Sequence, residues 1–244
     1  MSKNDSQKIR IILTLNEEEF FGLRTLPKAD FLEIRLDQFR SDNDTPEKIL
    51  HKIKELSASC VFTYRQPEDS SLESLGIWNR DNIAPLLSGL ESGKHYIDLE
   101  LDKDNPVFNG IDEDRFGIIR SVHSFSGVPD FEELLFFLRP VTEEVLATVK
   151  SELPFQRIFK IAALPKDEQE SEEFQHSALK LSKFCAKQNI PIGFCGILMG
   201  ESGKEFRIFP EKIGSQFTYC CLGEPKAPGQ VDLETVLSKR KLKD

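Results

Sequence analysis

The sequence contains no apolar run long enough to cross a lipid bilayer. Its first residues, Met1–Lys8, are polar and lack the hydrophobic core of a signal peptide, so residues 1–8 are predicted to be a flexible leader. The formal net charge is −9, and no stripe of Lys and Arg is visible. Nucleic acid is therefore not expected as a partner. We expect a cytoplasmic protein that binds neither membranes nor nucleic acid.

Cysteine and histidine are scarce. The chain has five cysteines and four histidines, and no pair of cysteines has the spacing of zinc ligands. The histidines are scattered along the chain, which gives little support to a metal site. Most of the cysteines lie in or beside apolar, strand-like runs, as buried reduced thiols of a cytoplasmic protein do. We expect no metal and no organic cofactor.

The sequence also lacks an internal repeat, a low-complexity linker and a Gly-rich nucleotide-binding fingerprint, so no domain boundary is placed within residues 1–244. Short apolar runs alternate instead with helix-like stretches. Several runs are continuously apolar, which is typical of parallel strands covered on both faces. Eight strands are predicted: Ile9–Leu15, Phe31–Asp37, Cys60–Arg65, His95–Leu101, Gly117–His123, Ile158–Leu164, Pro191–Ile197 and Gln216–Leu222.

Helical patterns lie between these strands. Thr45–Leu56 has a good N-cap residue in Thr45 and a proline, Pro46, at the first helical position. The other predicted helices are Asn16–Arg24, Asn79–Leu90, Asp130–Leu138 ending before Pro140, Glu143–Glu152, Glu168–Gln188, a short helix before Gly214, and Leu233–Lys241. Eight strands that alternate with helices in a chain of 244 residues predict an α/β protein, a single-domain (β/α)8 TIM barrel. A doubly wound open sheet is the structural alternative.

Polar residues interrupt these strands near their carboxyl ends, where a barrel carries its catalytic groups. Glu33, Arg35 and Asp37 fall on one face of their strand by two-residue alternation. Asp98 and Glu100 also share a face, and we interpret them as an interior ion-pair network that fills a layer of the barrel. The remaining polar residues at strand ends are Arg65, His123 and Lys160.

Lys160 is the least expected of these residues, because it lies in the middle of the apolar run Ile158–Leu164. Burial favours the neutral form of an amine, and a neutral amine attacks carbonyl groups to form a Schiff base. The alternative is a strand-edge lysine whose head reaches water. Arg35, Arg65 and His123 would share the same barrel mouth, a composition that suits an anionic, hydroxylated carbonyl substrate.

Over nearly its whole length the chain resembles the type I 3-dehydroquinate dehydratases of the shikimate pathway. Each of the motifs that carry the resemblance is weak alone, but their order along the chain is specific. They are Glu33–Asp37, Thr63–Arg65, Asp98–Glu100, Ser121–Phe125, Phe159–Ala162, Leu198–Gly200, Phe206–Arg207, Gly214–Ser215 and Ala227–Gln230.

The resemblance implies a role for each matching residue. Lys160 would form the imine with the ketone of 3-dehydroquinate, and His123 would act as general base and then as general acid. Arg207 would bind the substrate carboxylate, Met199 would line the pocket, and Ala227–Gln230 would close over the substrate. The residues implied to hold the hydroxyl groups are Glu33, Arg35, Arg65 and Gln230. The resemblance also implies a homodimer.

The chain departs from the family pattern at several positions. Asp69 takes the place of a glutamate that pairs with the catalytic histidine, so we expect Asp69 to orient His123. Ser124 replaces an aspartate that follows this histidine in the family. Lys226 takes the place of a serine that contacts substrate, so it would add a second contact to the carboxylate or hold the lid open.

Two other functions compete with the dehydratase. A Schiff-base aldolase on the same barrel would bind a sugar phosphate through a Gly-rich loop, for which Gly196–Gly203 is a faint candidate. A non-catalytic barrel that binds a quinate-like metabolite is the second. Arg207 and Gln230 suit a carboxylate better than a phosphate, which favours the dehydratase.

Overall fold

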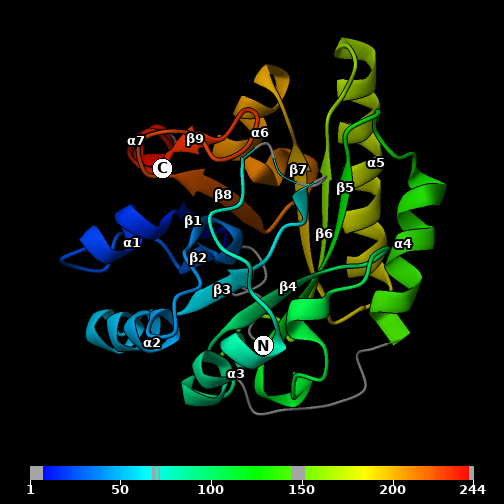
Figure 1. Cartoon of the computed structure of the whole chain (residues 1–244). Coiled ribbons are helices and arrows are strands. Elements are labelled where there is room, and N and C mark those ends of the chain that lie inside the picture. The colour runs from blue at the N-terminus through cyan, green and yellow to red at the C-terminus, as the bar shows by residue number, and fades with distance from the viewer. Residues whose placement is uncertain (1–7, 68–69, 71, 144–151, 242–244) are drawn as a thin grey trace.

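The computed structural model describes residues 8–67, 70, 72–143 and 152–241, and these residues form a barrel of parallel strands (Figure 1). Each predicted strand is present, with small changes at its ends. The strands are β1 (Arg10–Leu15), β2 (Phe31–Arg35), β3 (Cys60–Thr63), β4 (Tyr96–Glu100), β5 (Gly117–Ser124), β6 (Arg157–Ala163), β7 (Gly193–Leu198) and β8 (Phe217–Cys221). Neighbours in sequence are neighbours in the sheet, and β1 also pairs with β8. This order confirms the barrel and excludes the doubly wound sheet.

The barrel has a seam between β7 and β8, where no strand ladder is formed in the described part of the chain. The backbone N–H of Gln216 donates to the carbonyl of Phe194 (2.9 Å), and that of Gly196 donates to the hydroxyl of Ser215 (3.1 Å). Nearer the mouth, a short ninth strand, β9 (Val231–Asp232), pairs in parallel with β8. The segment between β8 and β9 therefore begins at the end of β8 and leads into a strand that pairs with β8.

Helices surround the strands on the outside (Figure 1). They are α1 (Glu17–Gly22), α2 (Thr45–Leu56), α3 (Arg80–Gly89), α4 (Phe131–Glu143), α5 (Glu168–Lys187), α6 (Lys204–Ile208) and α7 (Leu233–Lys241). After β4 the chain forms two 3-10 turns instead, η4 (Pro106–Phe108) and η5 (Glu113–Arg115).

Two helix boundaries differ from the prediction. The N-cap residue of α2 is Asp44, and Thr45 is already helical. Helix α4 does not stop before Pro140 but includes it and ends at Glu143. Pro140 is exposed, so water can satisfy the carbonyl group that loses its partner there. Most of the predicted helix Glu143–Glu152 lies outside the described residues.

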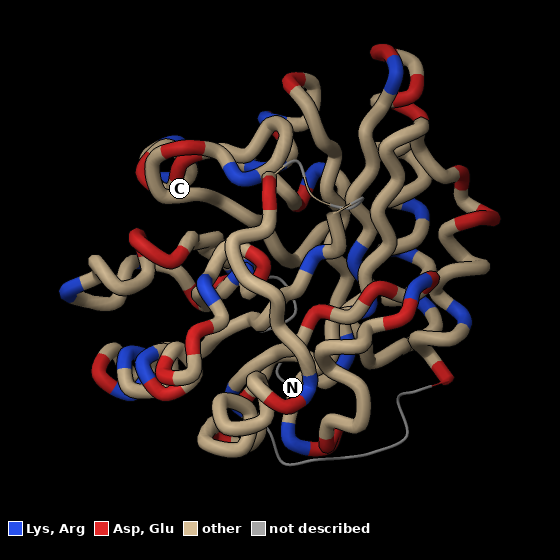
Figure 2. The backbone as a smooth tube through the Cα atoms, in the orientation of Figure 1, with Lys and Arg blue, Asp and Glu red and all other residues tan. Residues whose placement is uncertain are grey.

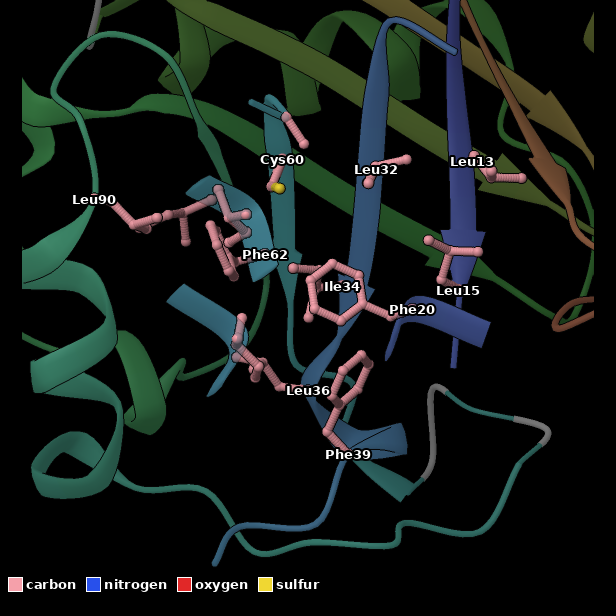
Figure 3. Packing of buried hydrophobic residues seen from close by; sticks show 14 of the residues in the cluster. Leu13, Leu15, Phe20, Leu32, Ile34, Leu36, Phe39, Cys60, Phe62 and Leu90 are labelled. Atoms are coloured by element: carbon pink, nitrogen blue, oxygen red, sulfur yellow. The ribbon is translucent and has the colours of Figure 1, made fainter. Parts of the chain in front are cut away.

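Alternation along the strands divides the apolar side chains between an inner and an outer core. In β2, Leu32 and Ile34 point outward, and they pack in one cluster with Phe20 from the first helix and with Phe39 (Figure 3). A second outer cluster lies under α4 and α5, and an inner cluster that includes Phe31 fills the barrel. Burial of each such side chain contributes roughly 1.5–3 kcal/mol. Because both faces of the sheet are covered, its strands have continuously apolar sequences.

The outer surface carries charges of both signs. Figure 2 shows Lys and Arg interspersed with Asp and Glu along outer helices such as α2. Among the described residues, no helix is long and apolar enough to cross a membrane. All five cysteines are buried and free, as predicted.

Candidate active site

A cavity of about 70 Å³ lies where the carboxyl ends of the strands meet, and it is lined by every predicted site residue that the structure describes. These residues are Glu33, Arg35, Arg65, His123, Lys160, Met199, Arg207, Lys226 and Gln230. Asp69 lies outside the described residues. The cavity also touches Thr14, Ala162, Ile197, Tyr219 and Ala227. The volume is below the roughly 300–1,000 Å³ of a typical ligand pocket, so part of the lining must move to admit a ring-sized substrate.

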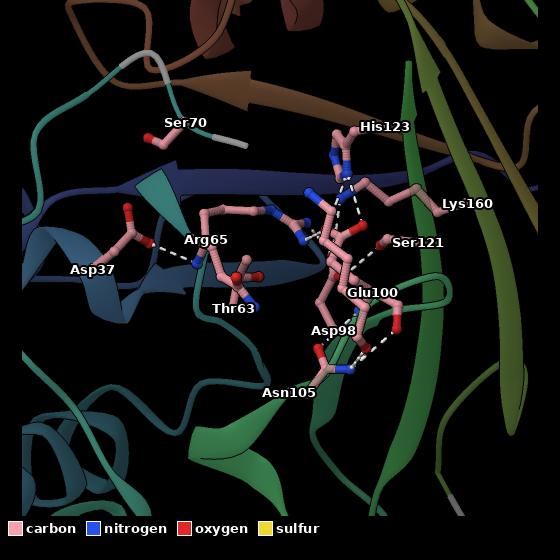
Figure 4. Close-up of polar contacts among 12 residues, drawn as sticks. Asp37, Thr63, Arg65, Ser70, Asp98, Glu100, Asn105, Ser121, His123 and Lys160 are labelled. Carbon is pink, nitrogen blue, oxygen red and sulfur yellow. Dashed lines mark hydrogen bonds and ion pairs between the residues drawn. The ribbon is translucent and has the colours of Figure 1, made fainter. Parts of the chain in front are cut away.

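Lys160 points into the barrel from β6 and is only 3% exposed, which rules out a strand-edge lysine that reaches water. Its Nζ lies 2.8 Å from Oδ2 of Asp98 on β4 (Figure 4). The same carboxylate oxygen accepts from Nη2 of Arg65 (2.7 Å), and the other oxygen accepts from the hydroxyl of Ser121. Lys160 is thus both buried and paired with a carboxylate.

His123 lies at the end of β5, and its Nδ1 contacts the carboxylate of Glu100 at 3.0 and 3.1 Å (Figure 4). An ionised carboxylate only accepts hydrogen bonds, so Nδ1 donates and Nε2 keeps the free lone pair. Burial, and then the positive charge of Arg65, lower the pKa of His123, although Glu100 opposes this shift. His123 is therefore neutral at pH 7 and can accept a proton at Nε2.

Arg65 connects the two carboxylates that hold Lys160 and His123. Its guanidinium donates to both Asp98 and Glu100. Burial alone would raise the pKa of Asp98, but the charges of Arg65 and Lys160 hold it well below its usual range. Burial also raises the pKa of Glu100, and Arg65 and His123 more than reverse that effect. Both carboxylates stay ionised, so this ion-pair network supports both predicted catalytic residues.

On the β1–β3 side of the cavity, neutral hydroxyl groups hold Glu33. Its carboxylate accepts from Thr14 (2.7 Å) and from Thr63 (2.8 Å). Arg35 instead binds Asp37 through two hydrogen bonds of 2.9 and 2.7 Å. The expectation that Asp37 continues the face of Glu33 and Arg35 was wrong, because β2 ends at Arg35 and a 3-10 turn carries Asp37 back to it.

Within the described part of the chain, two buried polar atoms on the β7–β8 side have no hydrogen-bond partner. Arg207, on α6, is 4% exposed, and among the described residues no carboxylate pairs with it. Its Nη2 donates to the carbonyl of Pro228 (3.0 Å), and its Nε has no hydrogen bond. Burial lowers the pKa of Arg207 to about 10, so it is still cationic at pH 7. The second unmatched atom is the hydroxyl oxygen of Tyr219.

The segment 222–230 borders the cavity through Lys226, Ala227 and Gln230. Gln230 donates to the hydroxyl of Thr14 (2.9 Å), and its own amide oxygen accepts from the backbone N–H of Lys226 (2.8 Å). Gly229 has φ +71°, and a Cβ there would lie 2.0 Å from the carbonyl of Gly200, so only glycine fits. We call this segment the lid.

Lys226 lines the cavity, but its ammonium is engaged on the far side of the lid. It binds the carboxylate of Glu19 on α1, and it also donates to the carbonyl groups of Leu222 (3.0 Å) and Glu224 (2.6 Å). These contacts engage the ammonium with protein groups, and both expectations for Lys226, a contact to the substrate carboxylate or a lid held open, stay predictions. Glu19 has no counterpart among the predicted site residues.

Sequence reasoning did not identify the contacts of Asp98 and Glu100, nor the positions of Thr14 and Tyr219. The alternation rule placed Asp98 and Glu100 inside the barrel, but it does not say which residues face them across it. Thr14 and Tyr219 are polar residues in apolar strands, which is the same signal that drew attention to Lys160. Among the described residues, no group of His, Cys, Asp and Glu side chains is arranged to hold a metal ion.

A parallel barrel with a buried, paired lysine and a neutral histidine at the carboxyl ends of its strands defines a barrel enzyme that acts on a small molecule. The chain belongs to the type I 3-dehydroquinase family, whose sequence model matches residues 22–242. This match confirms the resemblance stated from the motifs.

Relatives of known function agree with this family. The chain is 28% identical to a 3-dehydroquinate dehydratase of Aquifex aeolicus over 87% of both chains, and 27% identical to one of Archaeoglobus fulgidus over 93% of this chain and 95% of the relative. Similar solved structures include the type I 3-dehydroquinate dehydratase of Clostridium difficile with a covalently modified comenic acid (TM-score 0.71, 20% identity, 97% of this chain and 92% of that chain). The enzyme of Geobacillus kaustophilus also has this fold (TM-score 0.70, 19% identity, 96% and 91%).

Proposed function

We propose that this protein dehydrates 3-dehydroquinate to 3-dehydroshikimate through a Schiff base on Lys160, with His123 as general acid and base. One observation carries the proposal. The amine of Lys160 and the imidazole of His123 line the same cavity as Arg207, a buried cation that no carboxylate of the described residues pairs with. An amine, a base and an unmatched cation together suit a ketone with an acidic α-hydrogen and a carboxylate.

The first step is imine formation. Nζ of Lys160 gives one proton to water and attacks the ketone carbon, forming a C–N bond while the C=O electron pair moves to the oxygen. The ketone oxygen takes up two protons and leaves as water. The protonated imine is an electron sink for a carbanion on the next carbon. Asp98, 2.8 Å from Nζ, is placed to stabilise its positive charge.

Elimination follows. Nε2 of His123 removes a proton from the carbon beside the imine, and the electron pair forms an enamine. The enamine then expels the β-hydroxyl group, which takes the proton from His123 and leaves as a second water. Glu100 stabilises the imidazolium between these two events, because it contacts Nδ1. Water finally hydrolyses the imine and frees Lys160.

The remaining cavity residues bind the substrate. Arg207 would hold the carboxylate through its Nε, which has no acceptor among the described residues. Glu33, Arg35, Arg65 and Gln230 would contact the hydroxyl groups, and Met199 would pack against the ring. Each of these residues lines the cavity.

Mass spectrometry after borohydride reduction tests the proposal. The protein is incubated with 3-dehydroquinate and borohydride, and the adduct is located by peptide mapping. We expect one adduct on Lys160, together with an enone absorbance from the product in an unreduced sample. An adduct elsewhere, or none, would contradict the mechanism. An adduct without enone would indicate a binding protein, and cleavage of a sugar phosphate would indicate an aldolase.

The family resemblance also leads us to propose a cytoplasmic homodimer that serves the shikimate pathway. Sedimentation velocity at micromolar protein would test the dimer, and a single species with the mass of one chain would contradict it.

A further inference from the structure

Tyr219 lies directly beside the proposed Schiff-base lysine. It points into the barrel from β8 and is 5% exposed, and the face of its ring is 4.7 Å from Nζ of Lys160. It also lines the cavity that holds His123 and Arg207. The proposed mechanism does not use Tyr219, although its ring lies next to the atom that would attack the substrate.

The hydroxyl group of Tyr219 has no hydrogen-bond partner among the described residues, although it is buried. Tyr96, another tyrosine of the inner core, behaves differently, because its hydroxyl donates to the carbonyl of Phe155 (2.6 Å). A buried donor without an acceptor costs about 1–3 kcal/mol, and phenylalanine would fill the same space without this cost. The hydroxyl therefore needs an explanation other than packing.

The surroundings of Tyr219 keep this hydroxyl group a donor. Burial, and then the negative charges of Glu33 and Asp98, raise the pKa of Tyr219 well above its usual range. The group is therefore protonated at neutral pH. A protonated hydroxyl in a residue that lines the same cavity as the attacking amine is suited to bind an oxygen atom on the carbon under attack.

We propose that the Tyr219 hydroxyl donates a hydrogen bond to the ketone oxygen of the substrate and is a catalytic residue for imine formation and hydrolysis. This inference rests on the proposed function. When the Lys160 amine attacks, the C–N bond forms and the C=O electron pair moves to the oxygen. That oxygen takes up one proton from the attacking nitrogen to give the carbinolamine, then the proton that Lys160 had released to water, and leaves as water as C=N forms. Tyr219 stabilises the charge on the oxygen but loses no proton itself.

The test compares Tyr219→Phe with Tyr96→Phe in the full-length protein. Each variant is mixed with 3-dehydroquinate and quenched with borohydride at timed intervals, and the fraction of adduct on Lys160 is measured by mass. For Tyr219→Phe we expect imine formation to slow about 100-fold, the lower end of the loss of one oxyanion donor. Its melting temperature should stay the same or rise, since an unmatched polar group is removed. Tyr96→Phe should melt earlier and form the imine at the wild-type rate.

The outcomes separate this inference from the proposed function. If the wild-type protein forms an adduct on Lys160 and Tyr219→Phe forms it within about twofold of the same rate, the hydroxyl only fills space and the inference is wrong. Equal slowing in Tyr96→Phe would also overturn it, because the effect would then be a general loss of packing. No adduct in the wild-type protein would instead refute the proposed function.

Discussion

The two sides of the cavity differ in whether their polar groups have hydrogen-bond or ion-pair partners. On the β3–β6 side, Arg65, Asp98, Glu100, His123 and Lys160 form one network in which each charge meets an opposite charge or a hydrogen-bond partner. On the β7–β8 side, Arg207 and Tyr219 keep buried atoms that no described residue satisfies. The first side is complete without a ligand, and the second is incomplete.

This difference indicates that the two sides of the cavity have different functions. A buried network that is fully satisfied fixes side-chain positions before substrate arrives. Buried donors without an acceptor, in contrast, raise the free energy of the unliganded protein. A ligand that supplies the acceptors removes this cost. We infer that the β3–β6 side positions Lys160 and His123 and that the β7–β8 side supplies hydrogen-bond donors to the substrate. Four predictions test this division.

The largest expected effect is that of Lys160→Ala. Turnover of 3-dehydroquinate should fall by about 10⁴-fold or more, because the covalent route is lost. Lys166→Ala is a matched control, since Lys166 is an exposed lysine paired with Glu170 outside the cavity. Its rate should equal that of the wild type. Lys160→Ala with substantial enone formation would show that no Schiff base is needed.

Replacing one arginine on each side compares the two sides directly. Arg207→Met should lower kcat/KM by roughly 10²- to 10³-fold through loss of a buried charge contact to substrate. Its stability to urea should be unchanged or greater, because Arg207 has no carboxylate to leave behind. Arg65→Met should lose about 3–5 kcal/mol of stability, because Asp98 and Glu100 would be left buried and unpaired. Equal loss of stability in both variants would remove the distinction between the two sides.

The third prediction concerns the base. Activity requires neutral His123, and burial lowers the pKa of His123, so the acidic limb of the kcat/KM profile should lie below pH 6.5. Glu100 raises this pKa, so Glu100→Gln should move the limb to still lower pH and reduce kcat about 10-fold. Asp69→Asn is the comparison, because we expected Asp69 to orient His123. A larger shift in Asp69→Asn than in Glu100→Gln would make Asp69 the main partner of His123.

The smallest effect is expected for Lys226→Met. The ammonium of Lys226 binds Glu19 and two carbonyl groups, so its loss should weaken only the closure of the lid. We expect kcat/KM to fall about threefold, as for a partly exposed ion pair, and the lid to be cleaved faster by protease. A loss as large as that of Arg207→Met would show that Lys226 binds the substrate carboxylate itself.

The barrel could be predicted because its strands are buried on both faces. Runs such as Ile158–Leu164 stand out from the helical segments, and eight of them in a chain of this length fit few other folds. β9 was missed because its two residues leave no pattern. Pro140 was taken as a helix end, although its exposed position allows the helix to continue.

Much of the candidate site could also be predicted, for a related reason. A lysine or arginine inside a buried strand is costly, so Lys160 and Arg65 were visible from sequence. Contacts across the barrel were not visible, since alternation gives the face of a strand but not the residue opposite. For that reason Glu100 was found beside His123 only in the structure. Tyr219 was missed because a tyrosine in a strand is usual in a core.

The lid runs from β8 to β9, two strands that pair with each other, and this has a consequence for the entropy of closure. Both ends of the lid are fixed by the pairing of β8 with β9, so its backbone would sample few arrangements if it opened. Pro225 and Pro228 restrict it further. Ordering such a short tethered loop over a substrate costs little conformational entropy compared with a free loop. More of the binding energy of a small anion then remains to hold it beside Lys160.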